Sequence, residues 1–354
     1  MTSTRGQRGA RTPRRPSITD VAHRAGVSVG TVSNVLNRPE QVTPATRDRV
    51  QGAIEELGFV RNASARQLRA GTIQTVGAIV LDIANPFFTE VARGLEDRLA
   101  ADEYTLMLSS SDEDPAREAR YLRLFEEHGV QGIMVTPSLG TMEHLLAVRA
   151  RGIDVVLLDA TSNLPDLSSV AVDDVRGASL AIEHLVGLGH ERIAFINGPA
   201  SIRQCVDRQA GVRAALEAAG LDPERALVEV TIGSLNAHGG ERGVAQVLEL
   251  TSGAGDARPT ALFCVNDLTA LGALRALREH GIAVPSEMAV VGYDDVNFAS
   301  MLQVPLTSVH QPTHALGWTA ADLLLRQRIE GSTFTHQQVQ FQPELVIRAS
   351  SGAS

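Results

Sequence analysis

Short runs rich in β-branched residues alternate with amphipathic segments of helical periodicity through residues 74–350. The strand candidates are 76–81, 105–108, 133–136, 155–158, 193–196, 261–265 and 289–291, and the helix candidates are 87–99, 117–127, 178–188, 205–218, 239–250 and 269–280. This alternation is typical of parallel sheets covered by helices, because parallel strands need a crossover connection. The length of this part favours two sheets, and therefore an α/β body of two doubly wound lobes.

Polar or turn residues follow several of these expected strands. They are Asp82-Ile83-Ala84-Asn85-Pro86, Asp159, Asn197-Gly198-Pro199, Asn266-Asp267 and Asp294-Asp295. In open α/β sheets, ligands bind outside the carboxyl ends of the strands. The sequence therefore predicts a polar small molecule held between the two lobes.

Residues 18–37, ahead of this body, have the pattern of two short helices joined by a turn. Thr19 is expected to cap the first helix and Ser28 the second, with Gly26 between them. The apolar positions have helical spacing and are Val21, Ala22, Ala25, Val32, Val35 and Leu36. This is the outline of a helix-turn-helix, whose second helix enters a DNA groove.

A third helix is expected to begin at Pro44, with Thr43 as its cap, and to end at Gly58. Three such helices enclose a very small core, so the small all-α head over residues 17–60 is expected to depend on a partner or on DNA. The polar segment after it, NASARQLR, is shorter than the roughly 12 to 15 residues that an isolated helix needs in water. We therefore expect helix in the 61–73 linker only when something docks against it.

Charge is distributed unevenly along the chain. Residues 1–70 hold twelve arginines and five acidic residues, whereas residues 71–354 hold 20 arginines and 36 acidic residues. A basic head on an acidic body predicts that only the head binds a polyanion. Residues 1–16 lack acidic residues and apolar periodicity, so we expect a disordered basic tail.

The composition also argues against several classes of protein. The two cysteines, Cys205 and Cys264, are isolated, so neither a disulfide framework nor a zinc site is indicated, and no metal or cofactor is expected. No apolar run approaches the length of a membrane span, and the N-terminus lacks the apolar segment of a signal peptide. A cytoplasmic location without membrane association is the expectation.

The ordered motifs of the chain resemble the lac repressor and galactose repressor family of bacterial transcription regulators. Residues 20–37, directly after Thr19, match D-V-A-x-x-A-G-V-S-x-x-T-V-S-x-V-L-N throughout. Further matches are Asn62-Ala63-x-Ala65-Arg66-x-Leu68, Asn85-Pro86-Phe87-Phe88, His184-Leu185, Leu188-Gly189-His190, Gly198-Pro199, Arg208-x-x-Gly211, Asn266-Asp267, Val291-Gly292-Tyr293-Asp294-Asp295, Pro305-Leu306-Thr307 and Gln311. They extend from Ser17 to about Arg348.

The resemblance implies a homodimer whose two heads read half-sites of a near-palindromic double-stranded operator. Its body would resemble the periplasmic sugar-binding proteins, with one lobe from about 74–171 and 311–341 and the other from about 172–310 and 342–350. The tetramerising helix of the lac repressor has no counterpart after Arg348, so a dimer is expected. A ligand that closes the lobes would set the helix population of the 61–73 hinge.

The resemblance also assigns DNA contacts. They fall on Thr19, Val29, Gly30, Thr31, Ser33, Asn34, Asn37, Asn62, Arg66 and Leu68. Val29, Gly30 and Asn34 would face the bases, and Asn34 suits a bidentate contact to adenine. Leu68 would wedge into the minor groove, unless it packs on the body instead. For Thr19 and Asn37, helix capping alone is an equal alternative.

Effector contacts are assigned in the same way. They fall on Asp82, Phe87, Phe88, Asp159, Arg208, Asn266, Asp294 and Gln311. Phe87 and Phe88 would stack on the ligand or belong to the lobe core. Leu235 stands where many relatives have an aromatic residue, which favours a sugar or related polyol over a purine or nucleoside. Trp318 has helical apolar neighbours and is expected in the core.

Two other functions compete with regulation of transcription. A sugar-binding receptor would share the body, but it would begin with a signal peptide rather than with a basic three-helix head. An enzyme is disfavoured because the sequence has neither a nucleophile elbow, nor a phosphate loop, nor paired histidine ligands.

Overall fold

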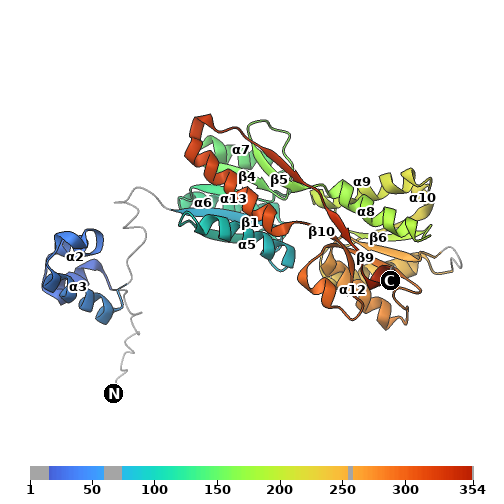
Figure 1. Cartoon of the computed structure of the whole chain (residues 1–354), viewed down its shortest axis with the longest axis horizontal. Helices are drawn as coiled ribbons and strands as arrows, with labels where there is room; N and C mark the ends of the chain where they lie inside the picture. Colours follow the sequence, from blue (N-terminus) through green and yellow to red (C-terminus); the bar gives the residue numbers. More distant parts are fainter. Residues whose placement is uncertain (1–15, 60–73, 254–257, 353–354) are drawn as a thin grey trace, which may run out of the picture. The chain divides into compact units, whose positions relative to one another are not determined.

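The computed structural model describes residues 16–59, 74–253 and 258–352. The chain divides between Ile73 and Gln74 into two compact units, a helical head and an α/β body (Figure 1). The expected fold class is confirmed, since small helices precede two helix-covered, mainly parallel sheets.

The head consists of α1 (Ile18–Ala25), α2 (Val29–Asn37), the 3-10 turn η1 (Pro39–Gln41) and α3 (Pro44–Leu57). Its core is formed mainly by the buried residues Val21, Ala22, Ala25, Val32, Val35, Val50 and Ala53. Gly26 and Gly58 end α1 and α3 at φ of 65° and 58°, in the left-handed region that glycine adopts without strain. The predicted helix-turn-helix is therefore confirmed.

The expected cap of α1 was wrong. Ser17, not Thr19, is the N-cap: its side chain accepts from the Asp20 amide, and Asp20 accepts in return from the Ser17 amide at 2.7 Å. This reciprocal capping box satisfies two amides that the first turn leaves without helical partners. Ser28 caps α2 as predicted, with its Oγ accepting from the Thr31 amide at 3.0 Å.

The first sheet of the body has the order β11-β5-β4-β3-β1-β2, and all of its strands are parallel. The strands are β1 (Thr75–Val80), β2 (Thr105–Ser110), β3 (Gly132–Val135), β4 (Asp154–Leu158), β5 (Ser168–Val172) and β11 (Gln338–Phe341). Helices α5 (Pro86–Ala100) and α13 (Thr313–Glu330) cover one face, and α6 (Pro115–Glu127) and α7 (Met142–Ala150) cover the other. Side chains alternate between the two faces along each strand, so both faces are buried.

The second sheet has the order β12-β10-β9-β8-β6-β7, and only β12 is antiparallel. The strands are β6 (Ile193–Asn197), β7 (Leu227–Thr231), β8 (Ala261–Cys264), β9 (Ala289–Asp294), β10 (Thr307–His310) and β12 (Glu344–Val346). Helices α8 (Asp174–Gly187) and α9 (Arg203–Ala218) cover one face, α11 (Ala237–Leu250) and α12 (Asp267–Glu279) cover the other, and α10 (Pro223–Ala226) precedes β7.

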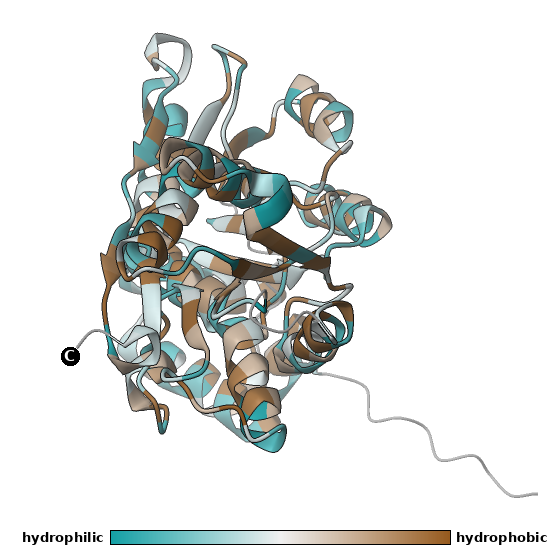
Figure 2. Cartoon of the chain, turned by 90° about the vertical axis from the view of Figure 1, so that its right-hand side faces the viewer, coloured by the Kyte–Doolittle hydropathy of each residue, from teal (hydrophilic) through white to brown (hydrophobic). Residues whose placement is uncertain are grey.

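The chain passes between the two sheets three times, between β5 and β6, between β10 and β11, and between β11 and β12. Apolar residues fill the centre of the body, as the colouring of the central strands in Figure 2 shows. The carboxyl ends of strands from both sheets therefore supply residues to one interlobe region, which contains the polar cluster described below.

All strands and helices that the sequence pattern predicted for the body are present, within a few residues of the expected ends. The pattern missed β5, β7, β10, β11, β12, α7 and α10, and α13 was recognised only as a helically spaced apolar set. The missed strands are short and contain polar residues, and all five lie at or next to a sheet edge. Trp318 was expected in the core but is 43% exposed, with Arg98 5.7 Å from its ring centre.

Candidate functional site

The second helix of the head presents short side chains to solvent. Val29, Gly30 and Asn34 are exposed, and Thr31 and Ser33 are half-buried. A Cβ at Gly30 would meet nothing closer than the Ser28 hydroxyl at 3.6 Å, so packing does not require glycine there. The exposed face of α2 has only short side chains and can enter the major groove of DNA.

Two other predicted DNA contacts, Asn37 and Thr19, lie on α2 and α1 of the head. Asn37 donates to the Ser33 carbonyl at 2.8 Å and to its hydroxyl at 3.2 Å, which ties together the last turn of α2. Thr19 is exposed in the first turn of α1, where it is free of the capping role expected for it. Asn62, Arg66 and Leu68 lie outside the described residues, so their assignment stays a prediction.

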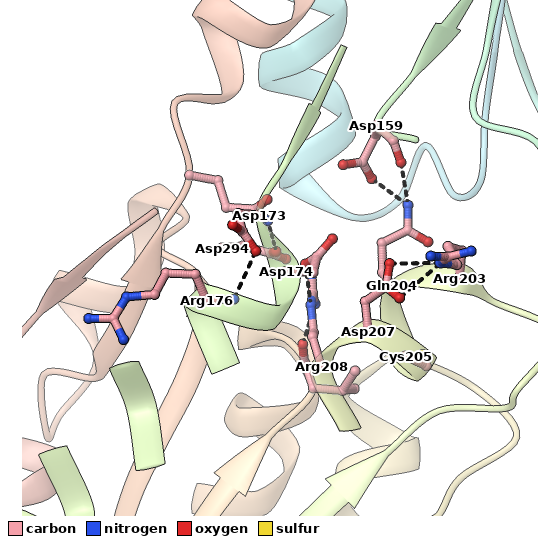
Figure 3. A network of polar contacts seen from close by, with 12 residues as sticks. Asp159, Asp173, Asp174, Arg176, Arg203, Gln204, Cys205, Asp207, Arg208 and Asp294 are labelled. Atoms are coloured by element: carbon pink, nitrogen blue, oxygen red, sulfur yellow. Dashed lines mark hydrogen bonds and ion pairs between the residues drawn. The ribbon is translucent and has the colours of Figure 1, made fainter. Parts of the chain in front are cut away.

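In the body, Arg208 of α9 is the centre of a buried polar cluster (Figure 3). Its Nε donates to Asp174 of α8 at 2.8 Å, and its Nη1 donates to the Val265 carbonyl at 2.5 Å. Its guanidinium lies 3.6 Å from the centre of the Tyr293 ring. Because a buried charge must be paired and hydrogen-bonded, these contacts fix the position of Arg208.

Tyr293 is itself placed by a glycine on α8. A Cβ at Gly177 would lie 2.2 Å from the Tyr293 hydroxyl, a distance that no real contact allows. The absence of a side chain at this position therefore lets the fully buried tyrosine lie beneath Arg208.

Asp294, at the end of β9, contacts residues from two other elements. Gln311 donates to its Oδ1 at 2.8 Å, and Asn85 of the other lobe donates to its Oδ2 at 3.4 Å. Its φ of 107° is a strained conformation for a residue other than glycine, and such strain is concentrated at functional sites. Burial raises the pKa of Asp294 to about 6, although the charge of Arg208 acts in the opposite direction.

Asp159, at the end of β4, forms the second contact between lobes. Gln204 of α9 donates to its carbonyl at 2.7 Å and to its Oδ2 at 2.8 Å (Figure 3). Burial, and then repulsion by Asp174, raise the pKa of Asp159 well above its ordinary value. Its other carboxylate oxygen, Oδ1, is buried without a hydrogen-bond partner.

The other predicted effector residues are placed differently. The Asn266 side chain caps α12 through the Thr269 amide and donates to the Leu235 carbonyl at 3.1 Å. Asp82 is half-buried and accepts from the Ala84 amide at 2.8 Å. Both side chains therefore have structural roles in this conformation.

Phe87 and Phe88 are only 3% and 5% exposed, and they pack edge to face with ring centres 4.9 Å apart. Both belong to the core that α5 forms with the first sheet, which favours the core interpretation over stacking on a ligand. Asp267 and Asp295 behave as structural partners: Asp267 accepts from Val296 and Ser308, and Asp295 pairs with Arg348 at 2.6 Å.

Sequence reasoning missed two residues of this cluster, Gln204 and Asp174, and two further polar residues at a strand end. Gln204 lies one helical turn before Arg208, so the helical period was a usable signal. Asp174 was not recognised because it begins a helix. Thr136 and Ser138 follow β3 and have buried hydroxyls without hydrogen-bond partners. They resemble the other strand-end residues, and that position was the signal that could have identified them.

Glu113, after β2, was also missed. It is half-buried and has a positive φ of 61°. Burial, and then the charges of Asp82 and Asp112, raise the pKa of Glu113 to about 7.

No helix in the described part of the chain is long and apolar enough to cross a membrane.

The fold and the buried cluster define a class of protein, a helical DNA-binding head joined to a body of the periplasmic-binding type. The model of bacterial regulatory proteins of the lacI family matches residues 17–62, and the model of the periplasmic binding protein-like domain matches residues 182–351. The chain is 35% identical to the HTH-type transcriptional repressor PurR of Aliivibrio fischeri (strain ATCC 700601 / ES114), over 94% of this chain and 98% of that protein.

It is 34% identical to the ribose operon repressor of Escherichia coli (strain K12), over 95% of this chain and 99% of that repressor. Among solved structures, the lac repressor dimer bound to operator and the anti-inducer ONPF has 28% identity and a TM-score of 0.77, covering 96% of this chain and 100% of its own. The chain therefore belongs to the lacI family of bacterial regulatory proteins.

Proposed function

We propose that this protein is a transcriptional repressor that binds a near-palindromic operator as a homodimer and responds to a small-molecule effector. The observation that carries this proposal is the similarity to repressors over nearly the whole chain, head and body together. A receptor that acts without DNA would not need the head. The named relatives are repressors rather than enzymes, and binding to chromosomal DNA implies a cytoplasmic location.

In this proposal the exposed face of α2 reads the operator. Asn34 makes paired hydrogen bonds to an adenine, Val29 contacts a thymine methyl group, and Gly30 allows close approach. Thr19, Thr31, Ser33 and Asn37 surround them and contact phosphates, which position the helix without reading sequence. Asn62, Arg66 and Leu68 of the hinge act in the minor groove.

The effector would bind at the carboxyl ends of the strands, around Arg208. Two hydrogen bonds between the lobes support this location. Asp294 accepts one from Asn85, and Asp159 accepts the other from Gln204. A ligand that replaces or reinforces these contacts changes the relative free energies of lobe arrangements. We infer that the lobe arrangement sets the spacing of the paired hinges and hence the affinity for operator.

The properties of the cluster favour a hydroxylated ligand over a flat base. Phe87 and Phe88 are buried in the core, and Leu235 offers no ring on the second lobe. Carboxylates and a guanidinium suit paired hydrogen bonds to neighbouring hydroxyl groups. A sugar or related polyol is therefore the preferred effector class, and a purine or nucleoside is the alternative.

We propose that two grooves on the body contact the second copy of this chain in the homodimer. One, of about 440 Å³, lies on the second lobe between α12 and the segment after β9, and is lined by residues such as Leu271, Leu274 and Leu302. The other, of about 530 Å³, lies on the first lobe between α5 and the edge strand β2. An edge strand has unpaired backbone groups that a partner can cover. Because each lobe would contact the partner, a lobe rotation would alter the dimer.

Selection of random double-stranded DNA by the full-length protein tests this function. We expect enrichment of a near-palindromic sequence whose binding weakens steeply with added salt, because arginines displace counterions from phosphates. Recovery of no common sequence, with binding of effector intact, would instead support a receptor without a DNA function.

A further inference from the structure

The folded head has no excess of positive charge. Residues 17–59 contain four arginines and five acidic residues, a formal charge of −1 with His23 neutral. Arg24 is paired with Glu56 at 2.5 Å, and Asp20 takes part in the capping box of α1. The remaining charged side chains of the head are exposed and balance one another: they are Arg38, Arg47, Arg49, Glu40, Asp48 and Glu55. Because phosphate contacts dominate the affinity of proteins for DNA, the head alone has little of the charge that such binding uses.

The positive charge of the N-terminal part lies on both sides of the head. Residues 61–69 contain three arginines, and residues 1–15 contain five, which are Arg5, Arg8, Arg11, Arg14 and Arg15. Neither segment contains an acidic residue, and both lie outside the described residues. Residues 1–15, which we call the N-terminal arm, therefore supply five of the eight positive charges that flank the head.

The chemistry of the N-terminal arm is confined to its arginines. No aromatic or branched apolar side chain occurs in residues 1–15, so the arm has almost nothing to contribute to a hydrophobic core. A guanidinium group, in contrast, donates paired hydrogen bonds to a phosphate. The lacI family model begins at residue 17, so the DNA contacts that family membership implies do not include the arm.

The N-terminal arm joins the head at an end that lies against DNA in the proposed mode of binding. Ser17 is the N-cap of α1, and Thr19 in the same turn is a proposed phosphate contact. In helix-turn-helix proteins the first helix crosses the DNA backbone, while the second lies in the major groove. Twelve residue steps lead from Arg5 to Ser17, and even a fully extended chain of that length reaches about 40 Å, or about 12 base pairs.

The acidic body is the competing target for the N-terminal arm. Residues 71–354 hold 36 acidic residues and 20 arginines. Many of these carboxylates are already paired, for example Glu126 with Arg151 and Asp322 with Arg98. Duplex DNA instead carries one negative charge for about every 1.7 Å of its axis, and it releases counterions when a cation binds. Both this density of charge and the attachment of the arm to α1 favour DNA as the target.

We propose that the N-terminal arm binds the phosphates of the duplex beside each operator half-site, and that it supplies much of the affinity for DNA without reading its sequence. This inference rests on the proposed function, because it requires that α2 dock on an operator. A dimer has two such arms, one for each flank of the operator. The arms also bind nonoperator DNA, where they keep the protein close to the duplex while α2 samples successive sites.

The test uses the full-length protein and two operator duplexes, one ending at the half-sites and one extended by about 12 base pairs on each side. The glutamine variant carries Arg5→Gln, Arg8→Gln, Arg11→Gln, Arg14→Gln and Arg15→Gln, and the lysine variant has lysine at the same five positions. The control variant carries the same change at five exposed arginines of the body, Arg120→Gln, Arg123→Gln, Arg225→Gln, Arg242→Gln and Arg258→Gln. Fluorescence anisotropy titrations from about 50 to 200 mM salt measure the affinity and its salt dependence.

On the extended duplex, the glutamine variant should bind about 10-fold or more weakly than the native protein at the lower salt concentration. Its plot of log K against log salt concentration should be shallower by about 4 to 9, because each phosphate contact contributes about 0.9 and the dimer has two arms. The native protein should bind the extended duplex more tightly than the short one. The lysine variant and the control variant should behave as the native protein does.

Unchanged affinity of the glutamine variant would overturn the inference, and tighter binding would place the arm on the acidic body instead. Equal binding of the two duplexes by the native protein also overturns it, as does a lysine variant that binds as weakly as the glutamine variant. In each of these outcomes the protein still selects an operator, so the proposed function stands. Failure of the native protein to select any operator sequence overturns the proposed function instead.

Discussion

The guanidinium of Arg208 lies over the buried ring of Tyr293, 3.6 Å from its centre, and this stacked pair connects three elements of the second lobe. Arg208 belongs to α9, Tyr293 to β9, and Asp174, which accepts from Arg208, begins α8. A desolvated cation over an aromatic ring gains roughly 2 kcal/mol. The pair therefore orients the polar cluster before any ligand is bound.

Replacement of Gly177 should disturb this arrangement. In Gly177→Ala the new methyl group collides with the Tyr293 hydroxyl, so the ring must move and Arg208 loses its support. We expect a loss of about 1 to 3 kcal/mol in the free energy of unfolding, typical of overpacking, together with weaker effector binding. Gly187→Ala, at the other end of α8, meets nothing within 4 Å and is the matched control. Urea denaturation would contradict the account if both variants behaved alike.

Neutralising Asp294 should stabilise the protein in a pH-dependent way. Because the folded pKa of about 6 exceeds the ordinary value of 3.8, the folded state favours the protonated carboxyl. Its stabilising contribution is complete below about pH 4 and is lost as the pH rises through 6, a change of up to about 3 kcal/mol. Asp294→Asn should therefore gain more stability over the native protein at pH 8 than at pH 5, and should lose effector binding.

Asp295→Asn provides the control for this prediction. The neighbouring carboxylate pairs with Arg348 at 2.6 Å, so its neutralisation should destabilise the protein at pH 8. Denaturation curves at the two pH values distinguish the variants. A gain for Asp294→Asn that does not change with pH would be inconsistent with titration of Asp294.

Asn34 should contribute to the choice of operator sequence. Asn34→Ala removes the exposed amide of α2, and loss of a paired contact to adenine should weaken operator binding by about 1 to 3 kcal/mol and relax the preference at one base position. Gln51→Ala, on exposed α3, should leave the preference unchanged. The measurement is sequence selection repeated with each variant, and an unaltered preference in Asn34→Ala would remove this residue from the reading surface.

A charge in the groove beside α12 should separate the dimer. Leu274→Arg places an unpaired cation among Leu271, Ile282 and Leu302, which is costly if a second copy covers them. We expect a concentration-dependent shift towards monomer in sedimentation velocity and weaker operator binding. Leu250→Arg, at a position 67% exposed and outside the groove, should remain dimeric. A dimeric Leu274→Arg would place the interface elsewhere.

The repeated parts of the fold were predictable because hydrophobic periodicity and strand-end chemistry are local signals. The residues around α2 and the strand-end residues Asp159 and Asp294 follow from such signals. Gln204 and Asp174 did not, because their importance arises from Arg208 and Asp159, which are distant in sequence. Likewise, Ser17 and Thr19 both suit a cap chemically, and only the backbone geometry decides between them. Phe87 and Phe88 were ambiguous because an aromatic residue has the same pattern in a core and in a ligand site.

The central claim is that a ligand bound at the buried cluster controls the affinity of the head for DNA. The most direct measurement is fluorescence anisotropy of the selected operator, titrated with full-length protein in the absence of effector and at a saturating concentration. The account predicts a change in operator affinity of about 5- to 150-fold, corresponding to a coupling of about 1 to 3 kcal/mol. Identical operator affinity with and without bound effector would contradict it.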